Sequence, residues 1–187
     1  SGDTGSAAIE ACRDRDAIEI FILHPEGKVS EVQRRQMTTV LSDNVHNVAI
    51  DGTFDDCQNL VKAMFNDADF RDRINLSAVN SINWARIMAQ IAYYFWAWSC
   101  HDAGSEAPVF AVPTGNFGNV FAAYGEHQMG LPIKKLSVGS NSNDILTRFF
   151  ASGSMKSGTV NPTISPSMDI QISSNFERFL FDLYGRD

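Results

Sequence analysis

The stretch Val-Phe-Ala-Val-Pro-Thr-Gly-Asn-Phe-Gly-Asn at residues 109–119 decides the fold. A β-rich run ends at Pro113, and a turn with two glycines leads into a helical pattern that starts at Val120. This order indicates a buried strand of a parallel sheet followed by a helix that returns across it. Ligands of such sheets bind beyond the carboxyl ends of the strands, where helix N-termini present free N–H groups.

Strand and helix signals alternate along the rest of the chain, which predicts an α/β fold with mainly parallel sheets and flanking helices. A polar stretch at 66–75 and a change of composition near residue 78 predict two domains, 1–78 and 79–187. The helix that follows Asn83 is apolar on nearly all sides, so we expect it to be central and buried. We expect strands at 18–23, 45–50, 76–79, 109–112 and 136–138, and helices at 7–13, 30–40, 54–65, 83–100, 120–129, 145–150 and 175–184. Ser30 and Thr53 are expected to cap the second and third of these helices.

Composition limits the kind of partner. The 187 residues are 44% hydrophobic and 20% charged, which is typical of a globular protein. A net charge of −7 without a basic run argues against nucleic acid or a membrane surface as the main partner. Three widely spaced cysteines predict reduced thiols and a cytoplasmic protein, and neither cysteines nor histidines have the spacing of metal ligands.

The turn at 114–119 has two interpretations. Glycines three residues apart let the backbone approach a ligand, and the helix start can bind a phosphate. The turn is neither a P-loop nor a dinucleotide fingerprint, because both the Gly-Lys-Ser/Thr sequence and the Gly-x-Gly-x-x-Gly spacing are missing. The alternative is a tight strand-to-helix turn in which Asn119 only caps the helix.

A second loop, Asn-Ser-Ile-Asn-Trp-Ala-Arg at 80–86, places Arg86 in the first turn of the long helix. The helix dipole disfavours a cation there, and an anion shared by Arg86 and the free amides would reverse that cost. The alternative is ordinary capping by Ser81 or Asn83, with Arg86 in a salt bridge. A third loop, Ser-Gly-Asp-Thr-Gly-Ser at 1–6, could bind a carboxylate through its amides or simply cap the next helix.

Together these loops resemble one enzyme family, the bacterial and fungal threonine synthases. The similarity runs from Ser1 to the end of the chain. Four motifs in the family's order indicate this family specifically, although each motif alone would be a weak signal. The motifs are Ser-Gly-Asp-Thr-Gly at 1–5, Asn-Ser-Ile-Asn-Trp-Ala-Arg at 80–86, Pro-Thr-Gly-Asn-Phe-Gly-Asn at 113–119 and Ser-Pro-Ser-Met-Asp-Ile at 165–170.

The resemblance implies the two-domain type II fold of pyridoxal-phosphate (PLP) enzymes. It also implies the conversion of O-phospho-L-homoserine and water to L-threonine and phosphate, in threonine biosynthesis. For the cofactor, it implies that the PLP phosphate is held by Gly115, Asn116, Phe117, Gly118 and Asn119, and that Asp3 lies beside the ring. For the substrate, it implies binding by Ser1, Gly2, Thr4, Gly5, Asn80, Ser81 and Arg86, with Thr4, Asn80, Ser81 and Arg86 at the phosphate.

In this family the lysine that forms the Schiff base with PLP lies upstream of the Ser-Gly-Asp-Thr-Gly motif. The partner of the pyridine nitrogen lies beyond the position of Asp187. The chain therefore resembles an internal segment without its catalytic lysine, and we expect it to be inactive alone and to need the rest of the polypeptide. None of its five lysines matches the family's context: Lys28, Lys62, Lys134, Lys135 and Lys156.

Two other functions remain open from the sequence. An amino-acid dehydratase of the same fold would have no use for a second phosphate site at Arg86. A non-catalytic phosphate-binding module would have kept the scaffold without the lysine.

Overall fold

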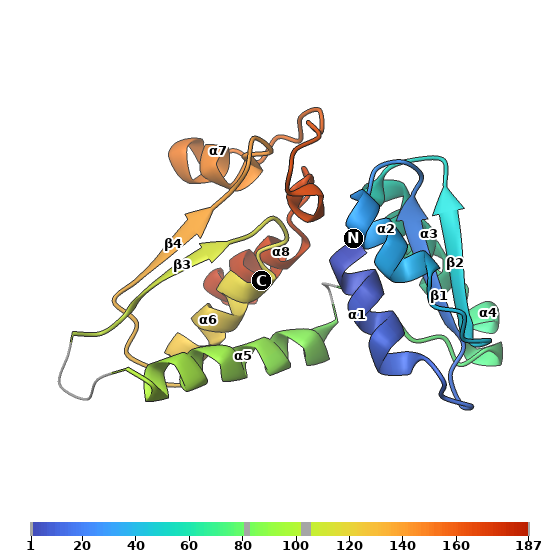
Figure 1. Cartoon of the computed structure of the whole chain (residues 1–187). Helices are drawn as coiled ribbons and strands as arrows, with labels where there is room; N and C mark the ends of the chain where they lie inside the picture. Colours follow the sequence, from blue (N-terminus) through green and yellow to red (C-terminus); the bar gives the residue numbers. More distant parts are fainter. Residues whose placement is uncertain (1, 81–82, 102–105, 187) are drawn as a thin grey trace. The chain divides into compact units, whose positions relative to one another are not determined.

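A computed structural model describes residues 2–80, 83–101 and 106–186. The chain divides into two compact units (Figure 1). The first unit comprises Ser1–Val79 with Ile164–Ser167, and the second comprises Asn80–Thr163 with Met168–Asp187. That these units correspond to the two domains of a complete enzyme remains a prediction.

The first unit is built on a parallel pair of strands with helices packed beside it (Figure 1). Strand register runs from Ile20 opposite Val45 to Pro25 opposite Ile50. Its core is a small apolar cluster around Met37, which is fully buried. The elements are α1 (Gly2–Cys12), β1 (Ile20–Pro25), α2 (Glu31–Thr38), β2 (Val45–Ile50), α3 (Phe54–Asn66) and α4 (Ala68–Arg73).

Capping residues set the starts of the helices in this unit. Ser30 and Gln33 form a capping box at α2, and Thr53 and Asp56 form another at α3. Both caps were predicted from the sequence and are confirmed. Helix α4 was not predicted, since its polar residues lack an apolar face, but the Asp67 side chain accepts a hydrogen bond from Phe70 N and starts it.

The second unit also contains a parallel pair of strands, with Val109 opposite Lys135 and Pro113 opposite Gly139. Helix α5 lies beside α6 in this unit (Figure 1). The elements are α5 (Trp84–Ser99), β3 (Val109–Pro113), α6 (Gly118–Gln128), β4 (Lys135–Gly139), α7 (Ile145–Ser152) and α8 (Ser174–Leu183), with a short 3₁₀ helix, η1 (Pro166–Met168), before α8.

The core of the second unit contains an aromatic group that joins α6, α7 and α8. Phe176 is 1% exposed, and its ring lies 4.9 Å from Phe117 and 4.8 Å from Phe149. Phe179 lies 5.7 Å from Phe117. These edge-on and tilted contacts fix the start of α6 against α8.

The predicted α/β fold with parallel strands is confirmed, but three details of the prediction are wrong. Residues 2–6 belong to α1 rather than to a loop, and residues 76–79 form no strand. Helix α5 is not buried on all sides: Ile87 and Tyr94 are buried, while Trp96 is 73% exposed. In the described part of the chain, α6 packs along this 16-residue helix, and the Tyr94 ring contacts Phe110 of β3.

Candidate functional site

The turn at 114–119 connects β3 to α6 and has a fixed shape. Thr114 N donates to Gly139 O at 2.9 Å, which extends the pairing with β4. Thr114 Oγ1 accepts from Phe117 N at 3.0 Å and closes the turn. Phe117 has a φ of 62°, which is unusual for a residue with a side chain, and burial of its ring in the aromatic group holds it there.

Helix α6 begins without a side-chain cap. Phe117 is the N-cap residue and makes no capping hydrogen bond, so the first N–H groups of α6 lack the partner that a cap would supply. Asn119 lies inside the first turn, so the alternative in which Asn119 only caps the helix is wrong. Its carbonyl oxygen accepts from Tyr94 Oη at 2.9 Å, which ties the turn to α5. An uncapped helix start of this kind suits a phosphate group.

The glycines of the turn lie against other segments. A Cβ placed on Gly115 would lie 2.9 Å from Ile170 Cδ1, and one on Gly118 would lie 3.4 Å from Ile87 Cδ1. Asn116 Oδ1 is buried without a hydrogen-bond partner among the described residues. The uncapped N–H groups at the start of α6 can donate to a phosphate, as the site predicted at this turn requires, whereas Asn116 Oδ1 is an acceptor and needs a donor.

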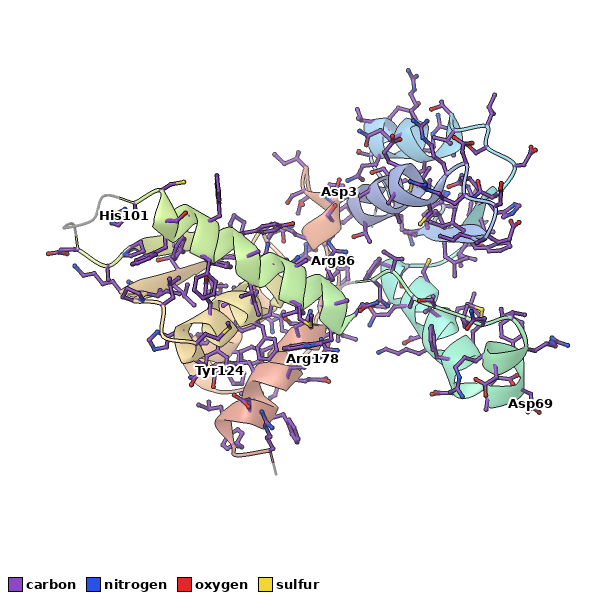
Figure 2. All side chains as sticks on the ribbon, turned by 90° about the horizontal axis from the view of Figure 1, so that it is seen from below. Asp3, Asp69, Arg86, His101, Tyr124 and Arg178 are labelled. Atoms are coloured by element: carbon purple, nitrogen blue, oxygen red, sulfur yellow. The ribbon has the colours of Figure 1, made fainter. Side chains whose placement is uncertain are left out.

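The start of α5 lies next to this turn, because Ile87 in its first turn contacts the position of Gly118. Asn83 caps α5 by accepting from Ala85 N at 3.0 Å, as the capping alternative expected. Arg86 is half-buried on the first turn of α5 (Figure 2). Asn80 is also half-buried, and Ser81 lies outside the described residues. The structure thus brings Arg86 and the 114–119 turn to neighbouring helix starts.

Asp3 lies in the first turn of α1, in the first unit, and not in a loop as predicted. Gly5 lets α1 approach α2 closely, since a Cβ there would lie 2.7 Å from Met37 Sδ. Gly2 and Thr4 share the first turn with Asp3, and Ser1 lies outside the described residues. A helix start still offers free N–H groups to a carboxylate.

Two side chains hold the carboxylate of Asp3, and the sequence did not reveal either. Gln33 Nε2 donates to Asp3 Oδ1 at 2.8 Å, and Ser167 Oγ donates to Asp3 Oδ2. Gln33 Nε2 also lies 3.2 Å from Ser167 Oγ. Ser167 belongs to the 165–170 motif, which was the available signal, but its partner is 164 residues away in the sequence.

Glu126 on α6 is a further unusual residue that the sequence analysis missed. It is 0% exposed, and neither carboxylate oxygen has a hydrogen-bond partner among the described residues. Burial raises the pKa of Glu126 to about 7. Burial, with the nearby charge of Glu126, also raises the pKa of Tyr94 to about 12.

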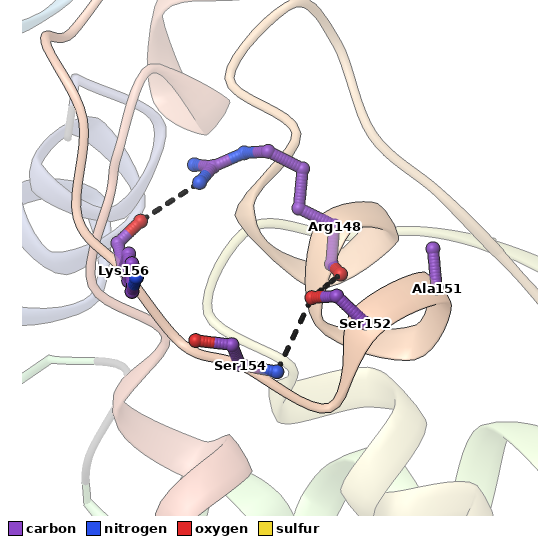
Figure 3. A pocket seen from close by; sticks show the side chains of 5 residues that line it. All are labelled: Arg148, Ala151, Ser152, Ser154 and Lys156. Atoms are coloured by element: carbon purple, nitrogen blue, oxygen red, sulfur yellow. Dashed lines mark hydrogen bonds between the residues drawn. The ribbon is translucent and has the colours of Figure 1, made fainter.

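A hollow of about 430 Å³ lies elsewhere in the second unit, at the end of α7 (Figure 3). Arg148 and Lys156 line it, but the Arg148 guanidinium bonds Asp144, Gln171 and the Lys156 carbonyl oxygen. These bonds indicate a structural role for Arg148. None of the predicted site residues lines this hollow.

The part of the chain that the structure describes contains neither a metal site nor a membrane-spanning helix. There, no three metal-ligating side chains lie close enough together to hold an ion. Within the same residues, no helix combines the length and the apolar character needed to cross a bilayer.

Comparison with known proteins bears on the cofactor. The family described as pyridoxal-phosphate dependent enzyme matches residues 1–187. The chain belongs to this family. Pyridoxal phosphate is the family's cofactor, and the structure has the α/β fold of the type II members.

The chain is also similar to threonine synthases over its whole length, as the motifs predicted. It is 60% identical to the enzyme of Pseudomonas aeruginosa over 187 residues, covering 100% of this chain and 40% of that protein. It is 51% identical to the enzyme of Saccharomyces cerevisiae over 186 residues, covering 98% and 36%. The crystal structure of PLP-bound threonine synthase from Brucella melitensis matches with a TM-score of 0.85 and 59% identity, covering 100% and 40%. The chain therefore spans about two fifths of the length of these relatives.

Proposed function

We propose that this chain is part of a threonine synthase, which converts O-phospho-L-homoserine and water to L-threonine and phosphate. One observation carries the proposal: the uncapped start of α6 after the 114–119 turn and Arg86 in the first turn of α5 are neighbours in the second unit. An enzyme whose cofactor and substrate both carry phosphate needs two such places. The proposal includes a role in threonine biosynthesis and a cytoplasmic location.

The 114–119 turn binds the phosphate of PLP through the uncapped N–H groups of α6. When bound, PLP supplies an electron sink for negative charge that develops on the substrate. In this proposal Asp3 is the residue beside the ring, and within the first unit the bonds from Gln33 and Ser167 fix the orientation of its carboxylate. The lysine that binds the cofactor covalently is supplied by a part of the polypeptide outside this chain.

The substrate is held at its two anionic ends. The first turn of α1, with Gly2, Thr4 and Gly5, binds its carboxylate, to which Ser1 also contributes. Arg86 binds its phosphate with Asn80, Ser81 and Thr4, because a guanidinium can donate two parallel hydrogen bonds to phosphate oxygens. Binding at both ends orients the substrate for reaction.

An amino-acid dehydratase is the second candidate within the family. Its substrates carry no phosphate, so Arg86 beside the cofactor turn favours threonine synthase. A non-catalytic phosphate-binding module would leave the arrangement of Asp3, Gln33 and Ser167 without a use.

The products distinguish these functions. The full-length polypeptide that contains this sequence, given PLP and O-phospho-L-homoserine, should form threonine and phosphate in equal amounts, as measured by amino-acid analysis and a phosphate assay. The 187-residue chain assayed alone should form no threonine, because none of its lysines has the family's context. A 2-oxo acid formed from threonine or serine, without use of phosphohomoserine, would identify a dehydratase.

A further inference from the structure

Asp169 is the centre of a hydrogen-bond network in the second unit. Four hydrogen bonds from three described residues end on its carboxylate. Asp169 Oδ1 accepts from Asn141 Nδ2 at 2.8 Å, from Asn143 Nδ2 at 3.1 Å and from Thr163 Oγ1 at 2.7 Å. Asp169 Oδ2 accepts from Thr163 N at 2.8 Å. The network joins the residues after β4 to the irregular segment before α8.

A second set of bonds holds the same segment from its other end. Gln171 is 5% exposed, and its Oε1 accepts from Arg148 Nη2 at 2.9 Å. Asn143 is 4% exposed and donates to Asn161 O at 2.8 Å. Arg148 lies on α7, so the segment that contains Asp169 is anchored to two other parts of the unit.

Between these anchors, Ile170 packs against the cofactor turn. Ile170 is 4% exposed, and its Cγ1 and Cδ1 would each lie 2.9 Å from a Cβ placed on Gly115. The Cα atom of Met168 would lie 3.6 Å from the same Cβ. The backbone at 168–170 therefore lies directly against Gly115, and its position limits the shape that the turn can adopt.

We propose that Asp169 is a positioning residue for the cofactor-phosphate turn: its hydrogen bonds hold Ile170 against Gly115 and so keep the turn in its phosphate-binding shape. This inference rests on the proposed function of the turn. An asparagine at 169 would direct an NH₂ group at one of the donors that now surround the carboxylate, since an amide offers one acceptor oxygen where a carboxylate offers two. Two acceptor oxygens, rather than the size of the side chain, are what the network requires.

The test compares two probes on the 187-residue chain, pyridoxal 5'-phosphate and pyridoxal, which lacks the phosphate. Calorimetric titration of the unchanged chain should show tighter binding of the phosphorylated probe. Asp169→Asn should weaken binding of pyridoxal 5'-phosphate at least tenfold and leave that of pyridoxal unchanged. Asp182→Asn is the matched control, because this α8 carboxylate bonds Tyr124 and Arg186, away from the turn.

A second pair of variants tests the contact directly, even if Asp169→Asn does not fold. Gly115→Ala should weaken binding of pyridoxal 5'-phosphate about tenfold, because its Cβ displaces Ile170. Gly115→Ala combined with Ile170→Ala should recover most of that loss. If the unchanged chain does not prefer the phosphorylated probe, the proposed cofactor site is wrong and the positioning role fails with it. If the unchanged chain does prefer the phosphorylated probe, either of two results would overturn the positioning role alone. One is an Asp169→Asn variant that keeps this preference. The other is a double variant that binds pyridoxal 5'-phosphate no more tightly than Gly115→Ala does.

Discussion

Arg86→Ala, introduced into the full-length polypeptide that carries this sequence, should raise the KM for O-phospho-L-homoserine. Arg86 is half-buried in the first turn of α5, so its charge is partly shielded from water where it pairs with the substrate phosphate. Loss of a buried charge pair costs about 2–5 kcal/mol. Since 1.4 kcal/mol corresponds to a factor of ten, kcat/KM should fall by roughly 30-fold to several thousandfold. Steady-state kinetics with a phosphate assay measures this change.

A matched control separates the loss of this contact from the loss of a positive charge. Arg35→Ala removes an exposed guanidinium on α2 that pairs with Glu31, so it should leave KM within about twofold. Arg86→Lys should lie between the unchanged protein and Arg86→Ala, because lysine keeps the charge without the two-pronged geometry. An Arg86→Ala variant with unchanged KM and kcat would reject the role of Arg86.

Glu126→Gln should stabilise the chain above neutral pH. The pKa of Glu126 is raised by burial from 4.5 to about 7, so the folded chain binds its proton more tightly than the unfolded chain does. The carboxyl is neutral in both states below pH 4.5, and the free energy of unfolding then decreases as pH rises towards 7. The loss is complete above pH 7 and amounts to roughly 3 kcal/mol, from about 1.4 kcal/mol for each pKa unit.

Urea unfolding at pH 5 and pH 8.5 measures this effect. Glutamine has no charge to bury, so the variant's advantage in unfolding free energy should be small at pH 5 and large at pH 8.5. Glu177→Gln on α8 is the control, since this side chain is exposed and its replacement should leave the free energy of unfolding nearly unchanged at both pH values. An advantage of equal size at the two pH values would contradict the account of Glu126.

Much of the fold could be predicted because its signals are local. The strand at 45–50 was predicted with the bounds that the structure has, and Ser30 and Thr53 were predicted as the caps that they are. Alternating apolar residues and capping boxes act within a few positions of each other, so one sequence is enough to detect them. The division into two domains near residue 78 stays a prediction; the first compact unit extends to Val79 and also includes Ile164–Ser167.

Features that depend on packing could not be predicted. The glycines at 2 and 5 indicated a loop, but Gly5 is a contact point where α1 approaches Met37. The apolar composition of α5 indicated burial on all sides. The buried part of a helix surface is set by the elements that pack against it, and these cannot be identified from the sequence of the helix alone. Ile164–Ser167 lies with the first unit although 160–163 and 168–171 lie with the second, and no local pattern signals this.

The same difference between local and packing-dependent features applies to the candidate site. Its loops were found from glycine spacing and helix starts, and the family resemblance gave each loop a role. The residues that hold these loops in place were not predicted. Asp3 bonds Ser167, and Gly115 packs against Ile170, only in the folded chain. The 165–170 motif was recognised as part of the family pattern, but its chemistry became clear only from its partners.

The central claim is that the 114–119 turn binds the phosphate of the cofactor. Amide NMR spectra of the ¹⁵N-labelled 187-residue chain, titrated with pyridoxal 5'-phosphate and separately with pyridoxal, test it most directly. The account predicts that the amide signals of Gly115, Gly118 and Asn119 shift with pyridoxal 5'-phosphate and not with pyridoxal. Shifts centred instead on the hollow lined by Arg148 and Lys156, or equal shifts with both compounds, would contradict it.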